Sequence, residues 1–173
     1  MKILVDSDSL IAYVAGGGDS VVDLLRLDGH DVEMIGYVGK TLKEMANNLQ
    51  QGEWDAVVIC GGGNDTFKFR SQAKIEADIV TIISHYTPLC KQIIVVPCPL
   101  SSVAAAKTRR HKLLAWWWLP KLAKTRQLTM NICQPVGVSF INRERWVMEI
   151  AEDGAHNNHH GHYGLYGDIK GSL

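Results

Sequence analysis

Short, mostly apolar runs recur along the chain, and polar or turn-forming residues end each of them. Runs of this length and composition are typical of strands that are buried on both faces of a parallel sheet. Pro97 and Pro99 would end the fourth run, because proline cannot donate a hydrogen bond to a neighbouring strand. The runs that predict strands are residues 2–5, 32–35, 56–60, 93–96 and 136–141.

Between the runs, apolar residues recur at the three- and four-residue spacing of helices that bury one face. Asp19 or Ser20 can cap the first helix, and Asp28 with Gly29 can end it. The last helical region is basic and should be interrupted at Pro120, because proline in a helix interior removes a hydrogen bond. After the first helix, the predicted helical regions are 41–51, 72–86 and 101–126.

This alternation of strands and helices predicts an α/β protein with three layers, in which helices cover both faces of a central parallel sheet. At 173 residues the chain has the size of one domain, and we expect a single domain over residues 1–173. In open sheets of this kind, ligands bind in the crevice at the carboxyl ends of the strands. We therefore expect the functional residues in the loops that follow the strands.

The composition argues against several classes of protein. A hydrophobic content of 46% with 21% charged residues is typical of a globular domain. Lys and Arg together number 18, as do Asp and Glu, so the net charge favours neither a nucleic-acid partner nor a membrane partner. The segment from Met1 to Asp6 meets a charge too soon for a signal peptide or a membrane span. We expect a cytoplasmic protein with no nucleic-acid partner and no membrane partner.

Residues suited to acyl transfer stand near the two ends of the chain. Ser9 directly follows the first apolar run, and Asp153 and His156 supply a carboxylate and an imidazole three residues apart. A serine hydroxyl is a poor nucleophile at neutral pH until a histidine accepts its proton and a carboxylate orients that histidine. Gly39 and Asn64 each follow a predicted strand, and both can donate hydrogen bonds to an oxyanion. We expect Ser9, Gly39 and Asn64 to meet at one edge of the sheet, with the last loop folding back to them.

The order of these motifs resembles that of the SGNH (GDSL-like) hydrolase family over nearly the whole chain. The family's usual glycine before Asp-Ser is Ser7 here, which departs from the pattern at the first turn. The four motif blocks match residues 7–10, 36–41, 62–65 and 153–156, and the Gly-His that follows the last block matches Gly161-His162.

The resemblance implies an SGNH-hydrolase-like fold and a serine esterase that forms an acyl-enzyme on Ser9. It implies that His156 is the base, that Asp153 orients it, and that Ser9, Gly39 and Asn64 form the oxyanion hole. It implies no metal or organic cofactor, and as substrates esters of carbohydrates, lipids or small acyl groups, including acetyl esters and thioesters. Among these we expect a small-molecule or carbohydrate ester. The loops after the strands are short and include no lid, so we expect a shallow crevice that favours small, acetyl-type acyl groups.

Three alternatives remain open. Asp6 and Asp8 form an Asp-x-Asp after a strand, as in Mg²⁺-dependent phosphatases and nucleases. A catalytically inactive binding protein with the SGNH fold is the second alternative, because Ser7 departs from the motif. The third is a zinc site in a histidine cluster, which consists of His156, His159, His160 and His162.

A basic run followed by three tryptophans is also found in proteins that bind single-stranded nucleic acid, because bases stack on exposed aromatic rings. The run is 107–112, and the tryptophans are Trp116, Trp117 and Trp118. Because the net charge is zero, we instead expect an amphipathic helix that buries one or two of the tryptophans. One exposed tryptophan could line the substrate pocket.

Overall fold

The computed structural model describes residues 1–98, 100, 102, 104–142 and 147–173. Its centre is a sheet of five strands, all parallel, in the order β2-β1-β3-β4-β5. The strands are β1 (Lys2–Ser7), β2 (Asp31–Met34), β3 (Trp54–Gly61), β4 (Cys90–Pro97) and β5 (Ser139–Phe140). Pro97 is the last residue of β4, whereas Pro99 lies outside the described residues.

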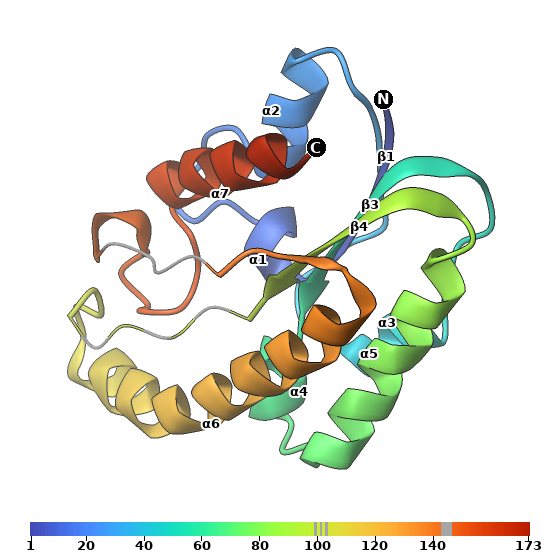
Figure 1. Ribbon diagram of the computed structural model, residues 1–173. Coiled ribbons are helices and arrows are strands. Elements are labelled where there is room, and N and C mark those ends of the chain that lie inside the picture. The colour runs from blue at the N-terminus through green and yellow to red at the C-terminus, as the bar shows by residue number, and fades with distance from the viewer. Residues whose placement is uncertain (99, 101, 103, 143–146) are drawn as a thin grey trace.

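Helices lie between the strands and on both faces of the sheet (Figure 1). The longest, α6, has 25 residues. Within the described residues, no helix combines the length and the apolar character needed to cross a bilayer. The α-helices are α1 (Ser9–Ala12), α2 (Val21–Leu27), α3 (Leu42–Ala46), α4 (Gly63–Phe67), α5 (Gln72–Tyr86), α6 (Arg109–Cys133) and α7 (His159–Ser172); two short 3₁₀ helices are η1 (Gln134–Val136) and η2 (Val147–Glu149).

Two apolar cores hold the three layers together. Successive side chains of a strand point to opposite faces, so Ile3 and Val5 enter one core while Leu4 enters the other. Helices α1, α2 and α7 cover the first core, and α3, α5 and α6 cover the second. The predicted three-layer α/β/α fold is therefore confirmed. That the whole chain forms one domain stays a prediction.

Most predicted elements are present, but the ends of several differ from the prediction. The helix predicted over 41–51 is only α3, because Asn47 and Asn48 are weak helix formers and the chain leaves the helix there. The strand predicted over 136–141 is only β5, because Val136 ends a 3₁₀ helix and Gly137 follows with a φ of +68°.

The prediction that Pro120 interrupts the last helix is wrong. Helix α6 continues through Pro120, whose exposed position places the missing hydrogen bond where water can replace it. On the opposite side of the helix, Ala115, Leu122 and Thr125 are buried, and this packing stabilises the helix across the proline. The predicted bounds of 101–126 are also corrected, because Thr108 caps the helix and α6 runs from Arg109 to Cys133. Residues 101 and 103 of the predicted region lie outside the described residues.

The expected burial of one or two tryptophans in this helix is also wrong. Trp116 and Trp117 are exposed, and Trp118 is only half-buried. Trp118 packs against the rings of Phe67 and Phe69 with centroid distances of 4.9 and 5.1 Å. Small residues such as Ala115 and Thr125 face the core instead, and the tryptophans stay outside because α6 lies close to its neighbours.

Candidate active site

Ser9 is the first residue of α1, directly after the end of β1. The carboxylate of Asp8 caps this helix, because its Oδ1 accepts a hydrogen bond from the Leu10 N–H at 2.9 Å. Asp8 is buried, and its burial raises the pKa of its carboxyl to about 7, although the Leu10 N–H favours the ionised form. The cap fixes the direction in which the chain leaves the strand, and with it the position of Ser9.

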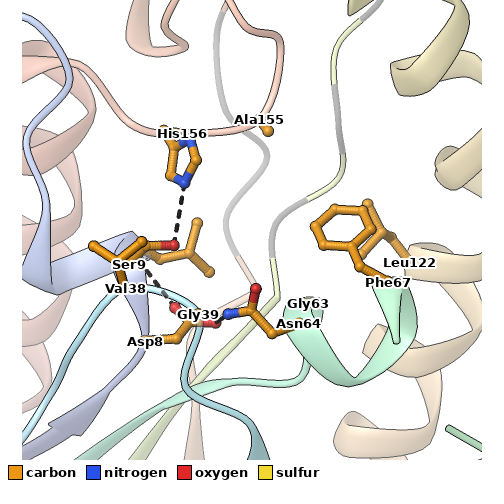
Figure 2. A pocket seen from close by; sticks show the side chains of 11 residues that line it. Asp8, Ser9, Val38, Gly39, Gly63, Asn64, Phe67, Leu122, Ala155 and His156 are labelled. Atoms are coloured by element: carbon orange, nitrogen blue, oxygen red, sulfur yellow. Dashed lines mark hydrogen bonds between the residues drawn. The ribbon is translucent and has the colours of Figure 1, made fainter. Parts of the chain in front are cut away.

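His156 lies against Ser9, although the two residues are 147 positions apart in the sequence. Its Nε2 is 3.1 Å from the Ser9 Oγ, and its Nδ1 is 2.6 Å from Oδ2 of Asp153. Figure 2 shows the imidazole pointing down onto the serine hydroxyl. The other oxygen of Asp153 accepts hydrogen bonds from the backbone N–H groups of Ala155, at 2.9 Å, and His156, at 3.0 Å.

These hydrogen bonds lower the pKa of Asp153 below its usual value, the one to His156 having the largest effect and those from the backbone a smaller one, while burial opposes them. The carboxylate is therefore ionised at neutral pH and holds the imidazole in one orientation. Gly154 allows this tight loop, since its φ is +76° and a Cβ there would lie 2.7 Å from the carbonyl oxygen of Ser102.

Gly39 and Asn64 line the same cavity as Ser9 and His156. The Asn64 side-chain amide donates to the backbone carbonyl of Lys40 at 3.0 Å and reaches Oδ2 of Asp8 at 3.3 Å. These contacts hold the amide nitrogen at the wall of the cavity, as Figure 2 shows. Asp153 lies behind His156 and does not line this cavity, so four of the five predicted site residues share its surface.

The cavity has a volume of about 230 Å³, and its walls are mainly apolar. A second cavity of about 280 Å³ adjoins it, and Phe67 and Ala155 line both. Leu114 and Trp118 of α6 contribute to the second cavity. The apolar wall residues of the first cavity were not predicted; they include Leu10 of α1, Val38 of the loop after β2, Phe67 of α4 and Leu122 of α6. The places of Phe67 and Leu122 depend on how α4 and α6 pack.

Beneath the site lies an ion pair that the sequence did not predict. Lys40 and Asp6 are both almost fully buried, and the Lys40 Nζ is 2.6 Å from Oδ1 of Asp6. The same ammonium group donates to the carbonyl of Ile35 at 2.6 Å. Burial raises the pKa of Asp6, and Lys40 opposes that rise. Nothing in the sequence marks Lys40 as half of an ion pair beyond its place after Gly39 in the motif block 36–41.

Gly36 accommodates the serine that replaces the family's glycine. The Ser7 Oγ donates to the carbonyl of Asp8 at 2.9 Å, and the turn keeps its form. A Cβ on Gly36 would lie 2.7 Å from the Ser7 carbonyl oxygen and 2.9 Å from its Oγ. The close approach of these two loops therefore depends on Gly36 having no side chain.

Several residues of the alternative Mg²⁺ and zinc sites interact with other groups of the protein instead. Asp6 is paired with Lys40, and Asp8 caps α1. The ring of His162 is buried and lies between the Val21 N–H, at 3.3 Å, and the carbonyl of Tyr13, at 3.0 Å. In the part of the chain that the structure describes, no group of three or more His, Cys, Asp or Glu side chains is placed to hold a metal ion.

No protein-family model matches the sequence, and no curated protein matches it either. Solved structures do resemble it. A lipase/acylhydrolase from Enterococcus faecalis superposes with a TM-score of 0.80 at 19% identity, over 99% of this chain and 94% of that one. A catalytic mutant of an acetylxylan esterase from Geobacillus stearothermophilus gives 0.75 at 16% identity, over 97% and 91%.

A GDSL-like lipase from Bacteroides thetaiotaomicron gives a TM-score of 0.74 at 14% identity, over 99% of this chain and 86% of that one. At identities this low, the structural match establishes the fold only, and the chemistry has to be argued from the site. The match extends over nearly the full length of each chain and includes the parallel sheet and its helices. This chain has the three-layer α/β/α fold of the SGNH (GDSL-like) hydrolases.

Proposed function

We propose that this protein is a serine esterase that hydrolyses small, acetyl-type acyl esters through an acyl-enzyme on Ser9. The observation that carries the proposal is the chain of two contacts from the Ser9 Oγ to His156, at 3.1 Å, and from His156 to Asp153, at 2.6 Å. A hydroxyl, an imidazole and a carboxylate in this order are the parts that activate a serine. The lipases and acetylxylan esterase that share the fold support ester hydrolysis as the type of reaction.

In the first half of the reaction, the Ser9 Oγ attacks the ester carbonyl carbon while Nε2 of His156 accepts the hydroxyl proton. The tetrahedral intermediate collapses, the bond to the alcohol oxygen breaks, and His156 returns the proton to that oxygen. In the second half, His156 takes a proton from water as the water oxygen attacks the acyl carbonyl carbon. The bond to the Ser9 Oγ then breaks, His156 returns the proton to that oxygen, and the acid is released. Asp153 stays ionised throughout and stabilises the imidazolium form of His156.

The negative charge on the intermediate needs donors on the side of the cavity opposite His156. We assign this role to the backbone N–H groups of Ser9 and Gly39 and to the side-chain amide of Asn64, which line that side. The contact of the Asn64 amide with the Lys40 carbonyl, at 3.0 Å, orients it before substrate binds, and the oxyanion would take the place of the longer contact with Asp8, at 3.3 Å. Donors held in place in this way cost little reorganisation during the reaction.

The substrate part of the proposal is an ester with a small acyl group, carried by a small molecule or a carbohydrate. A cavity of about 230 Å³ next to Ser9 suits a small acyl group better than a long chain. Phe67 stands between this cavity and the second one and limits the space for a long acyl chain.

Labelling with a fluorophosphonate probe tests the nucleophile, because only an activated serine reacts with it. We expect the wild type to be labelled, to hydrolyse p-nitrophenyl acetate, and to lose both properties in Ser9→Ala. Ser20→Ala is the matched control, since Ser20 caps α2 away from the cavity. Hydrolysis by a folded Ser9→Ala variant would contradict the serine mechanism. A folded wild type with neither labelling nor hydrolysis would instead favour a binding protein with this fold.

A further inference from the structure

The outer face of α6 carries three large apolar side chains that are mostly exposed. Leu113, Trp116 and Trp117 are 64%, 63% and 53% exposed. Their spacing of three and four residues makes them neighbours on one side of the helix, and we call them the α6 stripe. Single exposed apolar residues are common on protein surfaces, but three adjacent large ones often mark an interaction site.

The α6 stripe faces away from the protein. The opposite side of the helix is buried through Ala115, Leu122 and Thr125, which rest on the rest of the fold. Figure 1 shows α6 along the outer edge of the molecule, with the sheet on one side only. A large flat partner can therefore reach the stripe without any rearrangement of the fold.

Charge is unevenly distributed between α6 and the rest of the chain. The helix contains six Lys and Arg residues and no Asp or Glu, which leaves 12 basic against 18 acidic residues elsewhere. Arg109, Arg110, Lys112 and Lys124 are exposed, and no described residue forms an ion pair with them. The zero net charge of the whole chain therefore includes a strongly basic helix, and that zero by itself does not argue against an anionic partner at α6.

We propose that the α6 stripe and the basic residues around it bind the surface of an anionic lipid bilayer. Tryptophan rings prefer the boundary between headgroups and acyl chains, and a leucine there inserts its apolar side chain. Lysine and arginine beside them attract anionic headgroups within a Debye length of the surface. Apolar and basic residues on the same exposed face fit this partner and do not depend on the proposed hydrolase activity.

Two other partners fit the stripe less well. Single-stranded nucleic acid needs free aromatic faces, but the Lys121 ammonium lies over the Trp117 ring at 4.1 Å, and Leu113 provides no stacking surface. A second copy of this chain would place one basic helix against another across a twofold axis, where like charges repel.

The bound orientation would bring the candidate active site close to the bilayer. Leu114 and Trp118 of the same helix line the second cavity, which adjoins the one beside Ser9. Binding through the α6 stripe would therefore leave the site beside the membrane surface.

Co-sedimentation with vesicles tests the proposal. One set is pure phosphatidylcholine, and the other contains phosphatidylcholine and phosphatidylglycerol in about equal parts. We expect the wild type to bind only the anionic vesicles, less tightly as salt increases, with a blue shift of tryptophan fluorescence. The double variant Trp116→Ser/Trp117→Ser and the triple variant Arg109→Gln/Arg110→Gln/Lys112→Gln should each bind about tenfold more weakly or less. Leu27→Ser, which removes a 76% exposed leucine from α2, is the matched control and should bind like the wild type.

Four outcomes would overturn the proposal. They are no binding to anionic vesicles, equal binding to both kinds of vesicle, unchanged binding by the two α6 variants, and an equal loss in Leu27→Ser. Two further measurements address the competing partners. Tighter binding to an oligo-dT strand than to vesicles would identify nucleic acid as the partner, and a dimer that the tryptophan variant abolishes would identify a second copy. Circular dichroism of each variant establishes that its fold is intact.

Discussion

At the scale of single residues, the buried ion pair of Lys40 and Asp6 links the loop of Gly39 to the strand that leads to Ser9. Its two charged atoms are 2.6 Å apart, and water reaches neither side chain. The Lys40 carbonyl also accepts a hydrogen bond from the Asn64 amide. Lys40 therefore has two roles. Its ammonium group anchors the loop below the site, and its carbonyl holds Asn64 in the wall of the cavity.

Replacing Lys40 by methionine leaves Asp6 buried without its cation. We expect Lys40→Met to lower the free energy of unfolding by about 3–5 kcal/mol, the usual cost of breaking a buried pair. Urea denaturation followed by circular dichroism measures this loss. The double variant Asp6→Leu/Lys40→Met should recover much of it, because no charge then remains buried. Equal losses in the single and double variants would show that the pair acts through packing rather than charge.

The free energy of unfolding of Lys40→Met should also depend on pH, in a direction that follows from the pKa of Asp6. Burial already raises the pKa of Asp6 in the folded protein above its unfolded value, and removing Lys40 raises it further. The folded state then binds more protons than the unfolded state, so stability increases as pH falls toward the unfolded value. We expect Lys40→Met to regain stability relative to wild type between neutral and mildly acidic pH. A constant difference across that range would contradict this assignment.

The Asn64 amide gives a second prediction at this scale. Asn64→Ala should lower kcat by about a hundredfold to a thousandfold, because one oxyanion donor is lost, while KM changes little. Asn48→Ala, at an exposed position outside the cavity, is the control. Initial rates on p-nitrophenyl acetate separate kcat from KM. A rise in KM alone would show that Asn64 binds the substrate rather than the oxyanion.

At the scale of elements, α6 keeps a proline in its interior. Pro120→Ala restores a backbone hydrogen bond at an exposed position, and we expect the free energy of unfolding to increase by about 1–3 kcal/mol. Pro88→Ala is the control, because Pro88 is exposed in the turn between α5 and β4 and lies outside any helix. Urea denaturation of both variants makes the comparison. A loss of stability in Pro120→Ala would show that the proline shapes the helix.

The helices and strands that could be predicted from the sequence are those that local spacing of apolar residues determines. The helix predicted over 72–86 has the bounds of α5, because its apolar residues recur at helical spacing between those two ends. Pro120 misled the prediction, since packing on the far side of α6 outweighs a local breaker. The exposed tryptophans were missed because the sequence does not reveal which face of a helix meets the core.

For the candidate site, motif order predicted which residues would meet, because parallel strands bring their carboxyl ends to one edge. The ion pair of Lys40 and Asp6 could not be predicted in the same way. Its two residues are 34 positions apart, and nothing local marks them as partners. The wall residues Phe67 and Leu122 depend on the packing of α4 against α6, which no single segment encodes.

At the scale of the whole molecule, the two cavities that Phe67 lines are the basis for an expected acyl preference. We expect acetyl and butyryl esters to be hydrolysed with a higher kcat/KM than octanoyl esters, because Phe67 limits the cavity beside Ser9. Phe67→Ala joins the two cavities and should raise the relative rate on octanoyl esters. Rates on p-nitrophenyl esters of increasing length measure both effects. A wild type that prefers octanoyl esters would show that the acyl chain already passes Phe67.

The contact of Ser9 with His156 joins residues 147 positions apart, one in the first helix and the other just before the last. Loop-closure entropy makes such a contact slow to form and easy to lose, and α7 meets the rest of the fold mainly through α2 and η2. Local opening of the C-terminal segment would thus switch off catalysis while the sheet remains folded. In low urea, we expect hydrolysis of p-nitrophenyl acetate to be lost before the circular dichroism changes.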